Sequence, residues 1–292
     1  MPSLTLADLD QRPELAPAVL ALFAAAPPGA HHLVCGLPAA MGQEPTAEIL
    51  ARTSGMLLAL SGRQVAGAIG ICPYSEDQVT LWGPATAQAA VAEFLFTSTR
   101  EALHLSRFGS MRALIDTRNR EQRAFYRAHG FAAWKDNHLY ECVLETRTST
   151  GTVSRGSLAF KVRAATTRDH NAVISILTRA FPDSDHCLPS LAKREADGYR
   201  HYVLEEAGTV VAAAAVQDAG RRGWLKLIAV KPELRGRQLS RRLLEGVLAS
   251  ESRRGKRTMA LEVLADNAPA IALYEHAGFR RKWTATIMTG PV

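Results

Sequence analysis

The chain has 292 residues, of which 47% are hydrophobic, and a formal net charge of +7. That length is natural for two domains, and the apolar content is enough for a sizeable core. The chain has no run of eighteen apolar residues, and its first ten residues have acidic side chains but no basic region before an apolar segment. We therefore predict neither a membrane span nor a secretion signal, and expect a cytoplasmic protein without a membrane partner.

Two further classes of protein are disfavoured by the basic residues and the cysteines. Lysines and arginines are spread along the chain without interleaved aromatic side chains, so we predict no nucleic-acid partner. A phosphate-bearing cofactor or an acidic substrate explains the charge equally well. The cysteines stand singly, at Cys35, Cys72, Cys142 and Cys187. Their spacing predicts reduced thiols and no metal site.

Hydrophobic periodicity predicts alternating helices and strands in the first half of the chain. The expected helices are Pro13–Ala25, Thr46–Arg52, Ala90–Leu103 and Asn119–His129. The expected strands are Met56–Leu60, Val65–Ile71, Gln78–Trp82, Met111–Asp116 and His138–Leu144. Gly130 is expected to end the last of these helices, since glycine is favoured just after a helix.

A polar stretch rich in Thr, Ser and Gly, Glu145–Ser157, has no apolar period and is the expected linker. A similar order of elements follows it. The expected strands are Phe160–Arg163, Tyr202–Glu205, Val210–Val216, Trp224–Val230, Thr258–Leu264 and Trp283–Met288. The expected helices are Asp169–Ala180, a helix from Leu239 onward, and Asn267–His276.

The two halves align at a constant offset of 148 residues (267 minus 119). NREQRAFYRAHGF at Asn119–Phe131 lies over NAPAIALYEHAGF at Asn267–Phe279, with Asn, Tyr, Gly and Phe in register. At the same offset Pro84 lies over Pro232. Two matches at one offset, within the same order of elements, predict a duplicated domain.

The stretch Leu227–Leu248 runs from an apolar strand through Pro232 and a basic turn into a helix. One apolar stripe is formed by Leu239, Leu243, Leu244, Val247 and Leu248. Free N–H groups at the start of such a helix attract phosphate. Positive charge around this start is added by Arg235, Arg237, Arg241 and Arg242.

The second half resembles the GNAT superfamily of N-acetyltransferases in two motifs. Arg235–Ser240 stands where that family has an R/Q-x-x-G-x-G/A loop, and Asn267–Phe279 matches N-x-x-A-x-x-L-Y-x-x-x-G-F in full. Gln238 replaces the family's glycine, and Ser240 its small Gly/Ala. The resemblance implies an α/β (α+β) fold with two tandem GNAT-like domains, each a mixed, mostly antiparallel twisted sheet flanked by helices.

In the first half, Ala85–Ala92 takes the place of the loop and has neither arginine nor glycine. We therefore expect residues 1–145 to form a degenerate GNAT-like domain that lacks the cofactor loop. Residues 146–157 are expected to be a linker, and residues 158–292 an acetyltransferase domain that binds acetyl-CoA. The role of the first domain is open: it could wall the acceptor pocket, form a homodimer or stabilise the protein.

The resemblance implies acetyl-CoA as the acyl donor, without a metal. Main-chain groups of Ile228, Ala229 and Val230 are expected to pair with pantetheine and to polarise the thioester carbonyl. The pyrophosphate is expected on Arg235, Gly236, Arg237, Gln238, Leu239, Ser240 and Arg241. Asn267 is expected to bind pantetheine, with helix capping as the alternative.

Two residues are the expected catalytic groups. Tyr274, with a phenol of reference pKa about 10, is the expected general acid for the departing thiolate. The alternative is a core tyrosine, which is also the expectation for Tyr126 at the matching place. Glu262 is the expected general base, and a solvent-facing strand glutamate is the alternative.

The acceptor is expected near Asp183, Asp185 and His186, in the region that lines the acceptor site in the family. Acidic side chains there favour a cationic amine, and a solvated loop is the alternative. The predicted function is acetyl transfer from acetyl-CoA to the amine of a small molecule, by direct attack in the second domain. Alternatives are acetylation of a protein or peptide amine, and a non-catalytic acyl-CoA-binding regulatory protein.

Overall fold

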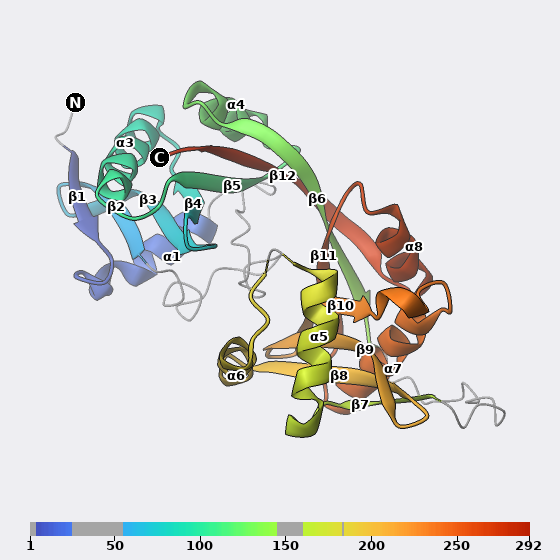
Figure 1. Ribbon diagram of the computed structural model, residues 1–292. Coiled ribbons are helices and arrows are strands. Elements are labelled where there is room, and N and C mark those ends of the chain that lie inside the picture. The colour runs from blue at the N-terminus through green and yellow to red at the C-terminus, as the bar shows by residue number, and fades with distance from the viewer. Residues whose placement is uncertain (1–3, 25–54, 145–159, 183) are drawn as a thin grey trace. The chain divides into compact units, whose positions relative to one another are not determined.

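The computed structural model describes residues 4–24, 55–144, 160–182 and 184–292 (Figure 1). Two compact units can be distinguished: the first unit is Met1–Asn137 with Thr284–Val292, and the second unit is His138–Trp283. The expected helix at 46–52, the expected linker at 146–157, Cys35 and Asp183 lie outside the described residues. No helix in the described ranges is both long enough and apolar enough to cross a membrane.

The first unit is a sheet with helices on both faces. Its strands are β1 (Leu4–Asp8), β2 (Gly55–Ser61), β3 (Gln64–Pro73), β4 (Gln78–Ala85), β5 (Ser110–Asp116), the first part of β6 (Ala132–Val143) and the last part of β12 (Arg280–Pro291). Its helices are α1 (Ala16–Ala24), entered through a 3-10 turn at Pro13–Leu15, α3 (Ala89–His104) and α4 (Arg120–Ala128). The strand order is β1-β2-β3-β4-β5-β12-β6, and β4 and β5 are parallel.

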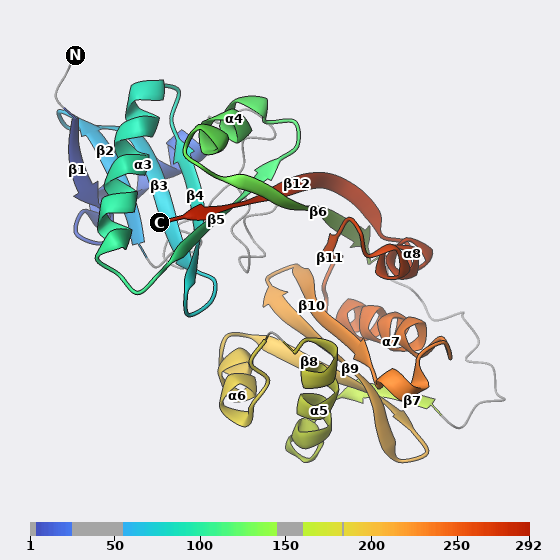
Figure 2. The same cartoon turned by 45° about the horizontal axis from the view of Figure 1, so that its top comes forward.

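Alternating side chains of this sheet build two cores on opposite faces. On one face Val19 and Phe23 of α1 pack with Leu58 of β2 and Trp82 of β4. The opposite core holds the neighbouring strand residues together with α3 and α4, namely Ala59, Ile69, Leu81, Val91, Leu95, Phe96, Tyr126 and Phe131. The period-two pattern of the strands therefore places α1 and α3 on opposite faces. Figure 2 shows α3 lying across β2 and β3 on one of these faces.

The second unit has the same plan. Its strands are β7 (Phe160–Ala164), β8 (Tyr199–Glu206), β9 (Thr209–Ala219), β10 (Arg222–Val230) and β11 (Thr258–Leu264), with the last part of β6 and the first part of β12. Its helices are α5 (His170–Ala180), α6 (Leu188–Ala196), α7 (Leu239–Arg253) and α8 (Ala268–His276), with 3-10 turns at Thr167–Asp169 and Pro232–Leu234. The stripe predicted from Leu239 to Leu248 is buried against one face, and α5 and α6 cover the other.

The last strand of each repeat lies in the sheet beside the other repeat. β12 pairs antiparallel with β5, from Ala285 opposite Asp116 to Pro291 opposite Ser110. β6 is the neighbour of β11 in the strand order. Within the second unit, Tyr140 of β6 donates a hydrogen bond from its hydroxyl to Glu275 of α8 at 2.8 Å. The compact units therefore do not coincide with the two sequence repeats.

The longer of the two sequence matches between the repeats corresponds to matching structure. Asn119 and Asn267 both cap helices, with their side-chain oxygens accepting from Gln122 N at 3.1 Å and Ala270 N at 3.2 Å. Gly130 and Gly278 both follow these helices with positive φ, at 84° and 93°.

The second match is wrong. Leu81 pairs with Ala113 and Leu225 with Leu261, so position 81 corresponds to 225, an offset of 144 rather than 148. Pro84 therefore lies within β4, whereas Pro232 begins a 3-10 turn after β10.

Most elements lie where the periodicity predicts them, and Thr258–Leu264 does so to the residue. The pattern predicts neither β1, which has only 5 residues, nor α6, whose 9 residues include a proline and the polar run Lys193–Glu195. It also started β6 six residues late, at His138 instead of Ala132. The missing part of β6 contains Lys135 and Asp136, which break the apolar pattern on which the prediction rested.

Candidate acetyl-CoA and catalytic site

The predicted strand pair β10 and β11 separates at its carboxyl end. Parallel pairing runs from Arg222 opposite Thr258 to Leu225 opposite Leu261 and stops there. Lys226 is an extra residue in β10, because the register with β9 shifts between Leu225 and Leu227. Such a bulge bends a strand and ends local pairing. The main chain at Ile228–Val230 therefore borders a gap between two parallel strands, where an extended ligand can pair with it.

The turn after β10 is built around two left-handed residues. Gly236 has φ +82°, and a Cβ there would have open space, so conformation rather than room favours glycine. Gln238 has φ +57°, although it carries a side chain. A non-glycine residue in this region costs about 1–2 kcal/mol. The side chain of Gln238 is exposed, as its replacement of a glycine requires.

The start of α7 offers main-chain donors. No side chain caps this helix among the described residues, and the Arg242 N–H makes the bond to the Gln238 carbonyl at 3.2 Å. The N–H groups of Leu239, Ser240 and Arg241 precede that bond and belong to the first turn, where a helix has no internal acceptors. The arrangement suits an anion such as a pyrophosphate.

The arginines around this start are only partly available. Arg237 forms an ion pair with Glu206 at 2.6 Å, and Arg241 forms one with Glu245 at 2.9 Å. Arg235 is exposed. Exposed ion pairs contribute only about 0–1 kcal/mol, so a multiply charged phosphate can compete for both arginines. The sequence reading did not foresee Glu206, because nothing local links it to a residue 31 positions away.

Glu262 and Tyr274 are on opposite sides of the sheet at this gap. Leu261 and Val263 belong to the core under α7 and α8, so Glu262 between them points to the opposite face. Glu262 is half-buried. Tyr274 of α8 belongs to the core on the α7 side, is 7% exposed and lies against Phe279. A base on one face and an acid on the other suit attack and departure at a bond held between the strands.

Burial raises the pKa of Tyr274 to about 12. The phenol is therefore protonated at neutral pH and able to donate. For its hydroxyl, no hydrogen-bond partner is found within the described ranges. By contrast, the hydroxyl of Tyr126 donates to the Gly83 carbonyl at 2.6 Å, and burial raises its pKa as well.

The remaining candidates have structural contacts. Asn267 caps α8 with its oxygen, which is the alternative role stated above, and its amide nitrogen is the part that could bind a cofactor. Asp185 accepts a bond from the Cys187 main chain at 3.2 Å, within its own turn. His186 is buried, lies 3.1 Å from Arg194, and has a pKa lowered by burial. Neither residue is shown to face an acceptor.

Comparison with known proteins shows to which family the chain belongs. A sequence model described as the acetyltransferase (GNAT) family matches residues 170–279. The N-alpha-acetyltransferase RimI of Mycobacterium tuberculosis is 33% identical over 126 residues, which are 41% of this chain and 78% of that protein. The chain belongs to the GNAT acetyltransferase family. The family match includes both the turn before α7 and the helix that carries Tyr274.

Other acetyltransferases also match part of the chain. The [ribosomal protein bS18]-alanine N-acetyltransferase of Escherichia coli K12 is 38% identical over 100 residues, which are 34% of this chain and 66% of that enzyme. The mycothiol acetyltransferase of Thermobispora bispora is 32% identical over 136 residues, which are 41% of this chain and 46% of that enzyme. The match thus spans just under two thirds of the E. coli enzyme and about half of the T. bispora enzyme.

Solved structures extend the likeness to the whole chain. A GCN5-related N-acetyltransferase from Sphaerobacter thermophilus superposes with a TM-score of 0.73 at 18% identity, covering 99% of this chain and 95% of that one. A tandem GNAT protein from the clavulanic acid biosynthesis pathway gives 0.69 at 17% identity, covering 99% and 98%. At these identities the likeness concerns the fold, and it confirms the expected tandem GNAT architecture.

Proposed function

We propose that this protein is an acetyl-CoA-dependent N-acetyltransferase whose chemistry takes place in the second unit. The observation that carries the proposal is the gap between β10 and β11, with a half-buried carboxylate on one face and a buried phenol on the other. Acetyl-CoA would supply the activated acyl group. Ile228, Ala229 and Val230 would bind its pantetheine through the main chain.

The turn and the start of α7 would hold the pyrophosphate. Its anion would lie on the N–H groups of Leu239, Ser240 and Arg241, within reach of Arg235 and Arg237. Gly236 and Gln238 give the turn the left-handed conformation that aims these donors. The amide of Asn267 would complete the cofactor contacts.

Two proton movements are assigned to this chain's residues. The Glu262 carboxylate accepts a proton from the ammonium form of the acceptor, directly or through water, which makes the nitrogen nucleophilic. The Tyr274 hydroxyl donates a proton to the sulfur as the thiolate leaves. Between these steps the nitrogen attacks the thioester carbonyl, the C–S bond breaks, and the acetylated nitrogen loses its second proton to solvent. The Tyr274 phenolate then regains a proton from solvent, and Glu262 releases to solvent the proton that it accepted.

The acceptor is proposed to be the amine of a small molecule. An α-amine of a protein is the second candidate, because two of the relatives are named for N-alpha and ribosomal-protein alanine acetylation. Thiol release from acetyl-CoA, measured with a panel of small amines and with peptides of varied N-terminal residue, separates the two. Saturable CoA binding without turnover of any amine would instead indicate a regulatory acyl-CoA-binding protein.

A further inference from the structure

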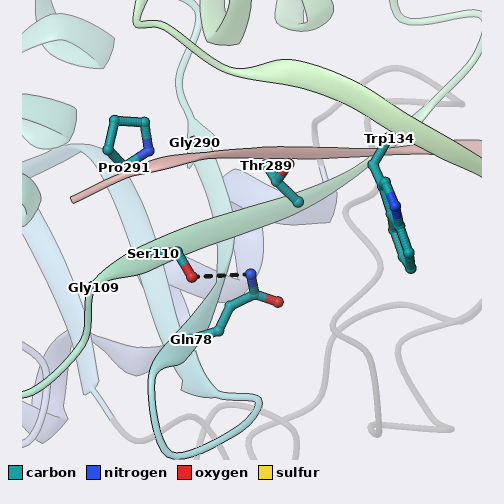
Figure 3. A pocket seen from close by; sticks show the side chains of 7 residues that line it. All are labelled: Gln78, Gly109, Ser110, Trp134, Thr289, Gly290 and Pro291. Carbon is teal, nitrogen blue, oxygen red and sulfur yellow. Dashed lines mark hydrogen bonds between the residues drawn. The ribbon is translucent and has the colours of Figure 1, made fainter. Parts of the chain in front are cut away.

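We propose that the first unit carries a saccharide-binding site on its sheet, independent of acetyl transfer. A cavity of about 510 Å³ lies where β4 and β5 begin and β12 ends. Its side chains include Gln78, Ser110, Trp134, Thr289 and Pro291, as Figure 3 shows. The volume is within the roughly 300–1,000 Å³ of small-molecule sites.

Trp134 provides the flat apolar surface of this cavity. Its indole is 58% exposed, although tryptophan is a large side chain that proteins usually bury in good part. Figure 3 shows the ring standing at the side of the cavity. An indole face carries negative charge density and favours ring C–H groups with partial positive charge. The axial C–H groups on one face of a pyranose have this character.

The floor of the cavity is polar. Ser110 pairs with Gln78 on one side and with Pro291 on the other, so the three side chains lie in one row across β4, β5 and β12. Gln78 donates from its amide nitrogen to the Ser110 hydroxyl at 3.0 Å. That bond leaves the Gln78 carbonyl oxygen as an acceptor and the Ser110 hydroxyl as a donor for a ligand.

The next row of the same face is polar as well. Thr80 pairs with Arg112, which pairs with Thr289. Thr80 is 1% exposed, and its hydroxyl has no partner in the part of the chain that the structure describes. The Arg112 guanidinium lies 3.9 Å from the centre of the Tyr74 ring, which is itself 55% exposed.

The charge and polarity of the residues that line the cavity indicate the class of ligand. None of the residues that line this cavity is charged. The two charges next to them have opposite signs: the Lys135 ammonium lies 5.6 Å from the centre of the Trp134 ring, and the Asp77 carboxylate accepts from Gly109 N at 2.9 Å. The site therefore favours neither an anion nor a cation. A wholly apolar ligand would cover the hydroxyl and amide groups without pairing them, which is unfavourable because each loses its hydrogen bonds to water. A neutral ring with one apolar face and hydroxyls at its edge can stack on the Trp134 indole and form hydrogen bonds with Gln78 and Ser110.

The test is an NMR titration of the full-length protein with glucose, galactose and N-acetylglucosamine, followed at the amides of Gly109 and Gly290. We expect at least one sugar to shift these signals saturably in the millimolar range. Trp134→Ala should weaken that binding about fivefold or more, since it removes the stacking surface. Gln78→Ala should also weaken it.

Leu105→Ala is the matched control, because Leu105 is an exposed apolar side chain (94%) of the same unit outside the cavity, and it should leave sugar binding unchanged. Indole serves as a flat ligand without hydroxyls. The proposal is overturned if no sugar shifts the signals up to its solubility limit, if indole shifts them while the sugars do not, or if Trp134→Ala leaves sugar binding intact. Acetyl transfer does not enter any of these readouts.

Discussion

Each repeat has its own copy of one helix, α4 in the first and α8 in the second, and the two copies differ in the surroundings of their tyrosine. In the first unit the Tyr126 hydroxyl bonds to the Gly83 carbonyl at 2.6 Å, and Gln122 donates to the same oxygen at 3.1 Å. Gly83 is on β4, where the strand runs beyond its pairing with β5. These bonds occupy the Gly83 carbonyl from within the first unit. In the second unit Ala270 stands in place of Gln122, and no partner of the Tyr274 hydroxyl is found in the described part of the chain.

Two further differences between the repeats also separate the second unit from the first. Position 262 carries glutamate, whereas the corresponding position of β5 is Leu114, which is 1% exposed. Between β10 and α7 run eight residues (231–238), but only three (86–88) connect β4 to α3. The fold of the first unit thus forms without a carboxylate at this position and without the longer connection. A tyrosine in the family's helix is evidence of the fold, and it indicates chemistry only where these two features accompany it.

The largest expected effect is that of Glu262→Gln. If Glu262 is the base, the variant should lose about 10²–10⁴-fold in kcat/KM while it keeps its affinity for acetyl-CoA. Steady-state kinetics and calorimetric binding measure the two. A loss below about threefold would remove Glu262 from the mechanism.

The matched pair Tyr274→Phe and Tyr126→Phe should give opposite results. Tyr274→Phe should lower kcat about 10²-fold with little change in the free energy of unfolding, since its hydroxyl bonds to none of the residues that the structure describes. Tyr126→Phe should leave kcat unchanged and destabilise the protein by about 0.5–1.5 kcal/mol, because the Gly83 carbonyl loses one of its two donors and keeps Gln122. Denaturant unfolding and steady-state kinetics on both variants check this. Equal losses of kcat would contradict the different roles assigned to Tyr274 and Tyr126.

The raised pKa of Tyr274 adds a pH dependence. A general acid works while it is protonated, so its contribution is present below its pKa and is lost as the pH rises through it. With that pKa at about 12, the activity of the wild type should show no alkaline fall due to Tyr274 below about pH 11. A fall near pH 8 that disappears in Tyr274→Phe would contradict this assignment.

Gly236→Asp tests the phosphate turn. The new side chain has space but must adopt φ +82°, and it brings negative charge beside the helix start. We expect acetyl-CoA affinity to fall about tenfold or more, together with a loss of about 1–2 kcal/mol in stability from the backbone.

The chain offers a close control for that variant. Gly255 follows α7, has φ +85° and also has open space around a Cβ. Gly255→Asp should cause a similar loss of stability and leave acetyl-CoA binding unchanged. Equal losses of affinity in both variants would show that the effect is one of stability alone.

Gln238→Gly should have the smallest effect. It relieves a strained residue, worth about 1–2 kcal/mol, but adds freedom to the unfolded chain, worth about 0.5–1 kcal/mol. The net gain should not exceed about 1.5 kcal/mol, and acetyl-CoA affinity should change less than about threefold. Thermal unfolding and calorimetry measure both, and a clear destabilisation would mean that the Gln238 side chain has a role of its own.

The sequence predicted the features that depend on local pattern. The helix Asn267–His276, its cap and the strand before it follow from periodicity and capping residues, and the missing loop of the first repeat follows from composition. It did not predict the placement of β6 and β12, because pairing between strands distant in sequence depends on register. The misaligned Pro84 has another cause: the connection from β10 to α7 has eight residues and that from β4 to α3 has three, so the offset before the connection is smaller than the offset after it.

The most direct test of the account is the stoichiometry of acetyl-CoA binding to the full-length protein, measured by isothermal titration calorimetry. The full chain is needed because each unit contains strands from both repeats. The account predicts about one site per chain, weakened about tenfold by Gly236→Asp and unaffected by Tyr126→Phe. Two sites per chain, or one site that survives Gly236→Asp and is altered by Tyr126→Phe, would place the cofactor in the first unit and contradict it.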